Sequence, residues 1–212
     1  MERRELLKMI AVLTGAVVVG GDLFLSGCKI GAKVEAGFTP TNISLLDEVG
    51  ETIIPTTTTP GAKAAKIGEF MKTMIIDCYK EKEQAAFVDG IARLETACKK
   101  ANGKPFMECT PQQRHDFLIA LEKEAKVYNT KRDEEDKPKK EANVKANSTL
   151  GWKDQKEFED APSHYYTMMK QLTLWGFFTS ETGSTKTLRH LPVPTKYDGN
   201  YAYKKGDKAW AE

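Results

Sequence analysis

The stretch of sequence that decides the fold runs from Leu172 to Gly199 and reads LTLWGFFTSETGSTKTLRHLPVPTKYDG. It opens with an apolar helical pattern, and a polar turn around Gly183 then leads to two prolines. Two interpretations compete: a buried last helix followed by a loop, or a docking surface. Aromatic side chains suit a docking surface because they offer large contact areas and lose little entropy on ordering. The docking interpretation predicts a partner interface formed by Trp175, Phe177, Phe178, Thr179, Glu181, Leu191, Pro192, Pro194 and Tyr197.

A first helix is expected after Ser44. Ser44 with Asp47 three positions later is typical of an N-terminal capping box, and Pro55 should end the helix. Residues 56–61 combine a threonine run with Pro-Gly, which predicts a connecting loop. Residues 29–43, which contain few apolar side chains, are predicted to be a tether.

Three further helices are indicated by apolar spacing and by a start signal. One apolar stripe extends from Ile67 to Cys78 and another from Phe87 to Cys98. Residues 110–113 read Thr-Pro-Gln-Gln, a threonine cap followed by proline at the first helical position. No stretch shows the alternation of a strand, so an all-α fold is predicted, with a compact helical domain over residues 44–199.

Two segments of this half of the chain look irregular. Residues 131–141 are charged at every position except Pro138, and residues 131–150 are therefore predicted to be a solvated loop insertion. The aromatic-rich segment after Pro194, with residues 200–212 at its end, has no helical period. Such a tail either wraps its own domain or is covered by a partner.

The first 28 residues have the features of an export signal. Arg3 and Arg4 precede an apolar run from Met9 to Val19, and Leu25-Ser26-Gly27-Cys28 resembles a lipobox. We expect export by the twin-arginine route and acylation at Cys28, which places the protein on the periplasmic face of a membrane as a lipoprotein. The alternatives are an unmodified Cys28 or an apolar anchor, although the run is short and broken by Gly20, Gly21 and Asp22.

Composition and motifs give no sign of independent chemistry. The 32 basic and 30 acidic residues leave a net charge of +2, so no nucleic-acid partner is expected. The three histidines lack ligand spacing, and no Cys-x-x-Cys, glycine-rich nucleotide loop or Gly-x-Ser-x-Gly is present. We therefore predict no catalytic residue, no metal site and no cofactor of its own.

The cysteines suggest a disulfide in an oxidising compartment. Cys98 ends one predicted helix and Cys109 directly precedes the next, so a bond between them would close the connection. Cys78 with Cys109 is the alternative pairing, and three buried thiols are the third possibility.

Several landmarks in order resemble the gluconate 2-dehydrogenase subunit 3 family, the small subunits of membrane-associated flavin dehydrogenases. The landmarks are Leu46 to Pro55, Thr59 to Ala62, Asp77 to Tyr79, Phe87 to Gly90 and Leu172 to Pro194.

The resemblance implies a partner. It implies a non-catalytic subunit that clasps an FAD-containing catalytic subunit of the glucose-methanol-choline class, carries the export signal for it, and serves a complex that oxidises sugars or sugar acids. A cytochrome c is the implied electron acceptor. Two other classes stay open: a stand-alone lipoprotein binding module, and an electron-transfer subunit between the dehydrogenase and the cytochrome.

Overall fold

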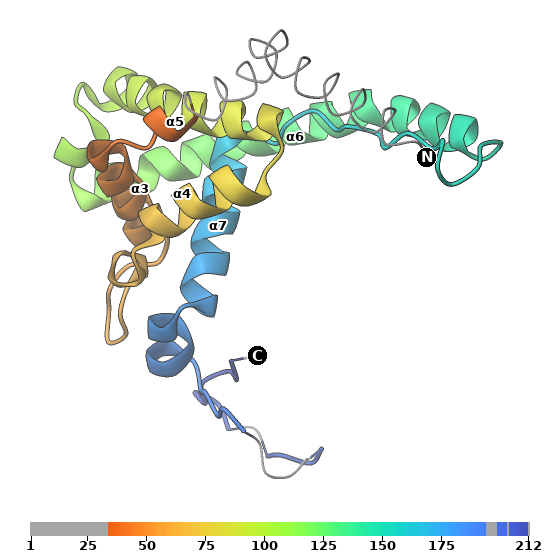
Figure 1. Cartoon of the computed structure of the whole chain (residues 1–212). Helices are drawn as coiled ribbons and strands as arrows, with labels where there is room; N and C mark the ends of the chain where they lie inside the picture. The colour runs from red at the N-terminus through yellow and green to blue at the C-terminus, as the bar shows by residue number, and fades with distance from the viewer. Residues whose placement is uncertain (1–33, 194–198, 203, 212) are drawn as a thin grey trace, which may run out of the picture. The chain divides into compact units, whose positions relative to one another are not determined.

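The computed structural model in Figure 1 describes residues 34–193, 199–202 and 204–211. Its main helices belong to one compact unit, Phe38–Glu212. No β-strand occurs in the described ranges, so the all-α prediction is confirmed. The helices are α3 (Pro40–Ile53), α4 (Ile67–Cys78), α5 (Glu81–Asn102), α6 (Pro111–Asn147) and α7 (Tyr165–Thr179), with the short turns η1 (Ala62–Ala65), η2 (Phe106–Glu108) and η3 (Gly183–Thr187).

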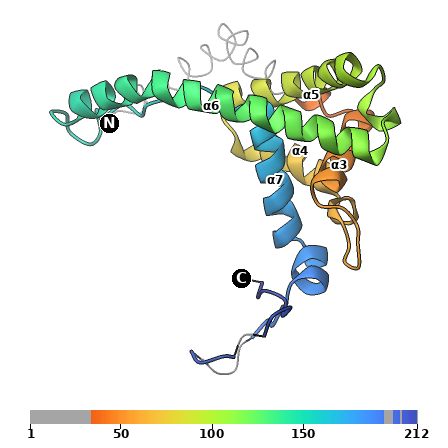
Figure 2. The same ribbon diagram turned by 180° about the vertical axis from the view of Figure 1, so that it is seen from behind.

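Helix α7 forms the centre of the core. It contacts α3, α4, α5 and α6, and Figures 1 and 2 show its N-terminal half between α4 on one side and α6 on the other. Its fully buried apolar side chains are Met168, Met169, Leu172 and Phe177. A helix that is apolar on most of its faces is stable only when other elements surround it.

Two glycines let α7 approach its neighbours closely. A Cβ atom at Gly90 of α5 would lie 2.2 Å from the Cβ of Tyr165, and one at Gly176 would lie 2.5 Å from the ring of Phe70 in α4. Both distances are far below a van der Waals contact. The absence of a side chain at these positions therefore fixes how deeply α7 is set between α4 and α5.

The predicted stripe on α5 is confirmed, and the stripe on α4 is confirmed except at its last residue. Ile67, Met71 and Ile75 are fully buried on α4, whereas Cys78 at its end is exposed. On α5, the buried residues include Phe87, Ile91, Leu94 and Cys98. Helix α6 begins with the predicted capping box, since Thr110 and Gln113 each accept a hydrogen bond from the other's backbone N–H.

The predicted start of the first helix was wrong. Helix α3 begins at Pro40, so residues 40–43 are helical and not part of a tether. The hydroxyl of Thr39 caps it by accepting the N–H of Asn42 at 3.2 Å, and Pro40 provides a pre-set φ at the first position. Ser44 lies inside the helix and donates to the carbonyl of Pro40.

The predicted loop insertion over residues 131–150 was also wrong. Helix α6 continues to Asn147, although the segment is exposed as expected for charged residues. Lysine, glutamate and arginine favour helices, and opposite charges fall at helical spacing, as in Lys131–Glu135. The chain then returns along α6, where the carboxylate of Asp136 accepts the N–H of Ala161 at 3.0 Å. The helix continues through Pro138, although a proline inside a helix costs roughly 3 kcal/mol.

The segment after η3 is held to the C-terminal segment. Arg189 and Trp210 form a parallel bridge, with the N–H of Arg189 donating to Ala209 and the N–H of Ala211 donating to Arg189, both at 2.8 Å. Within the described residues, no helix has both the length and the apolar character needed to cross a membrane.

Adjacent phenylalanines at the end of α7 provide a test of the packing. Phe177 is fully buried, whereas Phe178 is 41% exposed. Phe177→Ala should lower the free energy of unfolding by about 3–5 kcal/mol because it leaves a cavity in the core. Phe178→Ala should cost less than about 1 kcal/mol. Chemical denaturation of both variants measures the difference, and equal losses would contradict this packing.

Candidate partner-binding surface

The C-terminal half of α7 presents an apolar strip to solvent. Leu174, Trp175 and Phe178 lie on one side of the helix and are 39%, 52% and 41% exposed. The remaining faces of the helix carry Leu172 and Phe177, which are fully buried. We call Leu174, Trp175 and Phe178 the α7 strip.

Each aromatic ring of the α7 strip packs against a second aromatic ring of the domain. Trp175 contacts Phe70 edge to face, with ring centroids 5.9 Å apart, and Phe178 contacts Phe177 in the same way at 5.3 Å. Thr179 uses its hydroxyl to donate to the carbonyl of Trp175 at 2.7 Å. Rings held in this way lose little further entropy when a partner covers them, which favours an anchoring role.

A shallow groove between α6 and α7 continues from the strip. Its volume is about 250 Å³, and Leu174 belongs both to the groove and to the strip. Lys170 and Glu122 cross one side of it as an ion pair at 2.8 Å. The groove therefore places a charged pair beside an apolar strip, the usual arrangement of a binding surface with a polar rim.

The structure separates the residues of the predicted interface. The prediction for Phe177 was wrong, because its side chain is fully buried in the core and has no surface left for a partner. Glu181, Leu191 and Pro192 are exposed, as is Val193, which the sequence did not single out. Pro194, Tyr197, Arg3, Arg4 and Cys28 lie outside the described residues.

Arg189 is a residue of this region that sequence reasoning missed. Its guanidinium lies 5.3 Å from the ring centroid of Tyr201 and 4.6 Å from that of Trp210. It also lies 3.7 Å from the carboxylate of Asp207. Cation–π contacts of this kind hold the C-terminal aromatics against the segment that follows η3. In the sequence, the only signal was an arginine that precedes a segment rich in aromatic residues. Which aromatic rings it contacts depends on the backbone bridge between Arg189 and Trp210.

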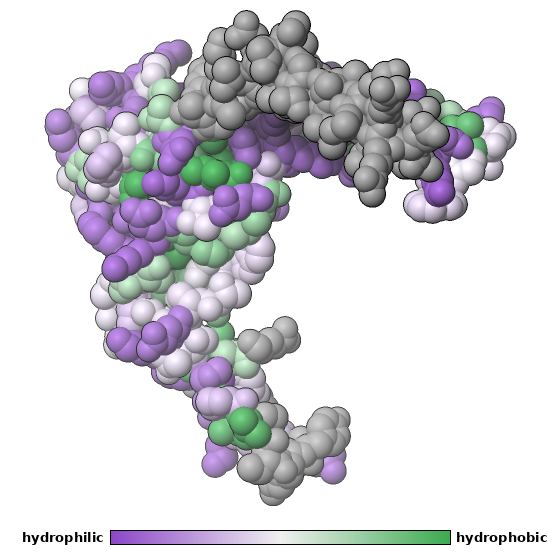
Figure 3. Space-filling view, in the orientation of Figure 1, coloured by the Kyte–Doolittle hydropathy of each residue, from purple (hydrophilic) through white to green (hydrophobic). Residues whose placement is uncertain are grey.

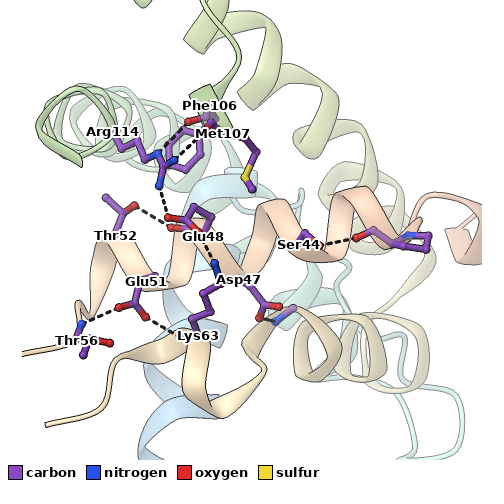
Figure 4. A network of polar contacts seen from close by, with 12 residues as sticks. Ser44, Asp47, Glu48, Glu51, Thr52, Thr56, Lys63, Phe106, Met107 and Arg114 are labelled. Atoms are coloured by element: carbon purple, nitrogen blue, oxygen red, sulfur yellow. Dashed lines mark hydrogen bonds and ion pairs between the residues drawn. The ribbon is translucent and has the colours of Figure 1, made fainter. Parts of the chain in front are cut away.

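A polar network on α3 is the other concentration of charged groups (Figure 4). Glu48 accepts hydrogen bonds from Arg114 of α6 and from Lys63, the latter at 2.8 Å. Arg114 also donates to the carbonyls of Phe106 and Met107, at 3.0 and 2.7 Å. One guanidinium thus ties α3, η2 and α6 together.

Two further carboxylates of α3 bind backbone N–H groups. Asp47 accepts the N–H of Gly68 at 2.8 Å, in the first turn of α4, where the helix has no side-chain cap of its own. Glu51 accepts the N–H groups of Thr56 and Lys63 at 2.7 and 3.0 Å. Each carboxylate therefore has a structural partner, and none is arranged as a free general base.

The pKa of Glu48 is lowered from its ordinary value. Desolvation on burial acts to raise it, but the hydrogen bonds and positive charges of Lys63 and Arg114 outweigh desolvation. A lowered pKa means that the ionised form stabilises the folded state.

The cysteines and histidines form no metal site in the described part of the chain. Cys98 and Cys109 are buried with their sulfur atoms 3.6 Å apart, and burial raises the pKa of the Cys98 thiol to about 11. His164 is buried and its Nδ1 accepts the N–H of Tyr166, so it caps α7. His115 and His190 are exposed.

A family model described as gluconate 2-dehydrogenase subunit 3 matches residues 40–195. The chain belongs to this family. The match begins at Pro40, the first residue of α3, and covers every helix of the domain. No curated protein and no solved structure matches the chain.

Three of the five landmarks of the gluconate 2-dehydrogenase subunit 3 family form two groups in this structure, whereas Asp77 to Tyr79 and Phe87 to Gly90 lie at the end of α4 and in α5. Those in α3 and the loop after it contribute to the Glu48 network. A Cβ atom at Gly61 would lie 2.4 Å from a carboxylate oxygen of Glu51, so this position has no room for a side chain. Those from Leu172 onward build the last turns of α7, including the α7 strip. The first group stabilises the domain, and the second reaches its surface.

Acid should remove the contribution of Glu48 to stability. Because folding lowers the pKa of Glu48, its contribution is present above the ordinary value of 4.5 and is lost as the pH falls through the lower folded value. Glu48→Gln should lower the free energy of unfolding by about 1–2 kcal/mol at neutral pH. The difference from wild type should shrink below about pH 4.

Denaturation curves at several pH values measure this difference. Glu134→Gln, at an exposed position of α6, is the matched control and should stay within about 0.5 kcal/mol of wild type. A Glu48→Gln effect that is constant down to acid pH would show that the charge does not stabilise the fold.

Proposed function

We propose that this chain is the non-catalytic small subunit of a flavin-dependent dehydrogenase, and that the α7 strip binds the catalytic subunit. The observation that carries the proposal is the exposure of Leu174, Trp175 and Phe178 on the helix whose other side is the core. Membership of a family named as a dehydrogenase subunit supports a larger partner. Clustered, supported aromatics on a monomer surface are typical of such a contact.

The strip alone is too small for a lasting complex. A permanent interface buries on the order of 2,000 Å² or more in total. The adjoining groove and the exposed residues Leu191, Pro192 and Val193 provide further apolar surface. We expect the contact to extend over both, with Pro194 and Tyr197 continuing it.

The partner supplies the chemistry in this proposal. It is a glucose-methanol-choline type subunit that holds FAD, oxidises a sugar or sugar acid and passes electrons to a cytochrome c. Arg3 and Arg4 would direct the folded complex to the twin-arginine translocase, and acylation of Cys28 would hold it on the periplasmic face of the membrane.

Two substitutions in the strip test the proposal. Full-length protein with a C-terminal tag is captured from native membranes, and the eluate is examined by absorbance and mass spectrometry. Wild type should bring down a yellow flavoprotein. The Trp175→Ala/Phe178→Ser variant should retain its fold but lose about 30-fold in affinity for each of the two aromatics, since a hot-spot aromatic contributes at least about 2 kcal/mol.

Val127→Ser is the matched control for this experiment, because Val127 is an apolar residue on α6 that is 71% exposed. It should leave the partner bound. Full retention of the flavoprotein by the strip variant would place the interface elsewhere. A colourless single chain from wild-type membranes would favour the stand-alone lipoprotein module.

Export predicts a disulfide between Cys98 and Cys109. Their sulfur atoms are already adjacent, whereas Cys78 is exposed at the end of α4, which makes the Cys98–Cys109 pairing the one the geometry favours. A loop this short adds roughly 3 kcal/mol in the chain-entropy model. Alkylation without reductant, followed by peptide mass spectrometry, should label Cys78 and leave Cys98 and Cys109 linked. Labelling of all three would leave free thiols as the answer.

A further inference from the structure

The end of α6 carries exposed apolar side chains far from the core. Residues 131–143 include no large apolar side chain. Val144, Leu150 and Trp152 then follow around the turn that ends the helix, and they are 68%, 43% and 80% exposed. Figure 3 shows apolar side chains beside charged ones at this end of α6. We call residues 144–156 the α6 tip.

The turn within the α6 tip is closed by its own hydrogen bonds. The side-chain amide of Asn147 donates to the carbonyl of Lys156 at 2.8 Å and accepts its N–H at 3.0 Å. The N–H of Asp154 donates to the carbonyl of Gly151 at 2.9 Å. These hydrogen bonds give the turn a defined conformation. The apolar side chains that it carries are exposed to solvent.

The charges of the α6 tip are mostly positive. Lys145, Lys153 and Lys156 are exposed, and Asp154 is the one acidic residue among them, so three positive charges less one negative leave +2. The ammonium group of Lys153 lies 5.4 Å from the ring centroid of Trp152. Tryptophan with flanking lysines is typical of the boundary between water and lipid, and lysines near an anionic surface each add about 1 kcal/mol.

The lengths of the chain allow this end of α6 to reach a bilayer. From Ala125, which is packed in the core, α6 continues to Asn147, or roughly 33 Å at 1.5 Å per residue. Val34, where the described residues begin, lies six residues after an acylated Cys28, and six residues span at most about 20 Å. The anchor segment would therefore hold the domain closer to the lipid surface than the roughly 33 Å by which α6 extends beyond Ala125.

We propose that the α6 tip is a second membrane contact, which inserts Trp152, Leu150 and Val144 into the headgroup region of a bilayer rich in anionic lipid. This membrane contact goes beyond the proposed small-subunit function. It rests on that function only for the acyl group on Cys28, which would hold the bilayer close to the domain. An anchor at one end leaves the domain free to rotate. A second contact at the end of α6 fixes which side faces the membrane.

Lipid quenching of Trp152 tests the proposal. Full-length protein is reconstituted into vesicles of brominated phosphatidylcholine, with and without phosphatidylglycerol. The difference in fluorescence between wild type and Trp152→Phe isolates Trp152, which should be quenched in the anionic vesicles. Replacing Lys145, Lys153 and Lys156 by glutamine should weaken the association of the tip by about fivefold per lysine.

Trp175→Phe is the matched control, because Trp175 belongs to the α7 strip and should contribute no quenching. Absence of quenching at Trp152 in anionic vesicles would overturn the proposal. If quenching is absent and a Trp152→Ser variant also loses the flavoprotein, the tip is a protein contact instead. Mass spectrometry of Cys28 in the same sample reports the acyl anchor separately.

Discussion

Burial of α7 is the interaction on which the rest of the structure depends. Four helices pack around it, and its methionine, leucine and phenylalanine side chains are among the most deeply buried of the described residues. The close approaches at Gly90 and Gly176 set its position, because even an added methyl group at either glycine would clash with the facing residue. Because the helix is held so tightly on one side, the α7 strip on its other side is a rigid surface. A rigid apolar surface is what a stable protein contact requires.

The polar groups of the domain hold elements together. Asp47, Glu48 and Glu51 occupy one helix, and each is engaged by a neighbouring element through a hydrogen bond or an ion pair. Carboxylates held in this way act as clamps. This arrangement agrees with a subunit that supplies a surface while the proposed catalytic partner supplies the flavin.

Helix α6 shows how charge can extend a helix beyond a core. Its first turns are held by Phe117, Leu118 and Leu121, and its later turns by ion pairs and by the returning chain, which Asp136 binds. A helix stabilised by surface charges can project without needing an apolar partner along its length. The proposed membrane contact uses that property, since it places apolar side chains only where the helix ends.

The sequence by itself determined the fold class, the stripes of α4 and α5, the cap at Thr110 and the family, because each depends on local spacing. The predictions missed the start of α3, where Thr39 caps earlier than Ser44, and the helical state of residues 131–147, where the returning chain contacts Asp136. Phe177 and Phe178 show the limit most plainly. They are identical neighbours about 100° apart on one helix, and only the packing of α7 decides that one is core and the other is surface.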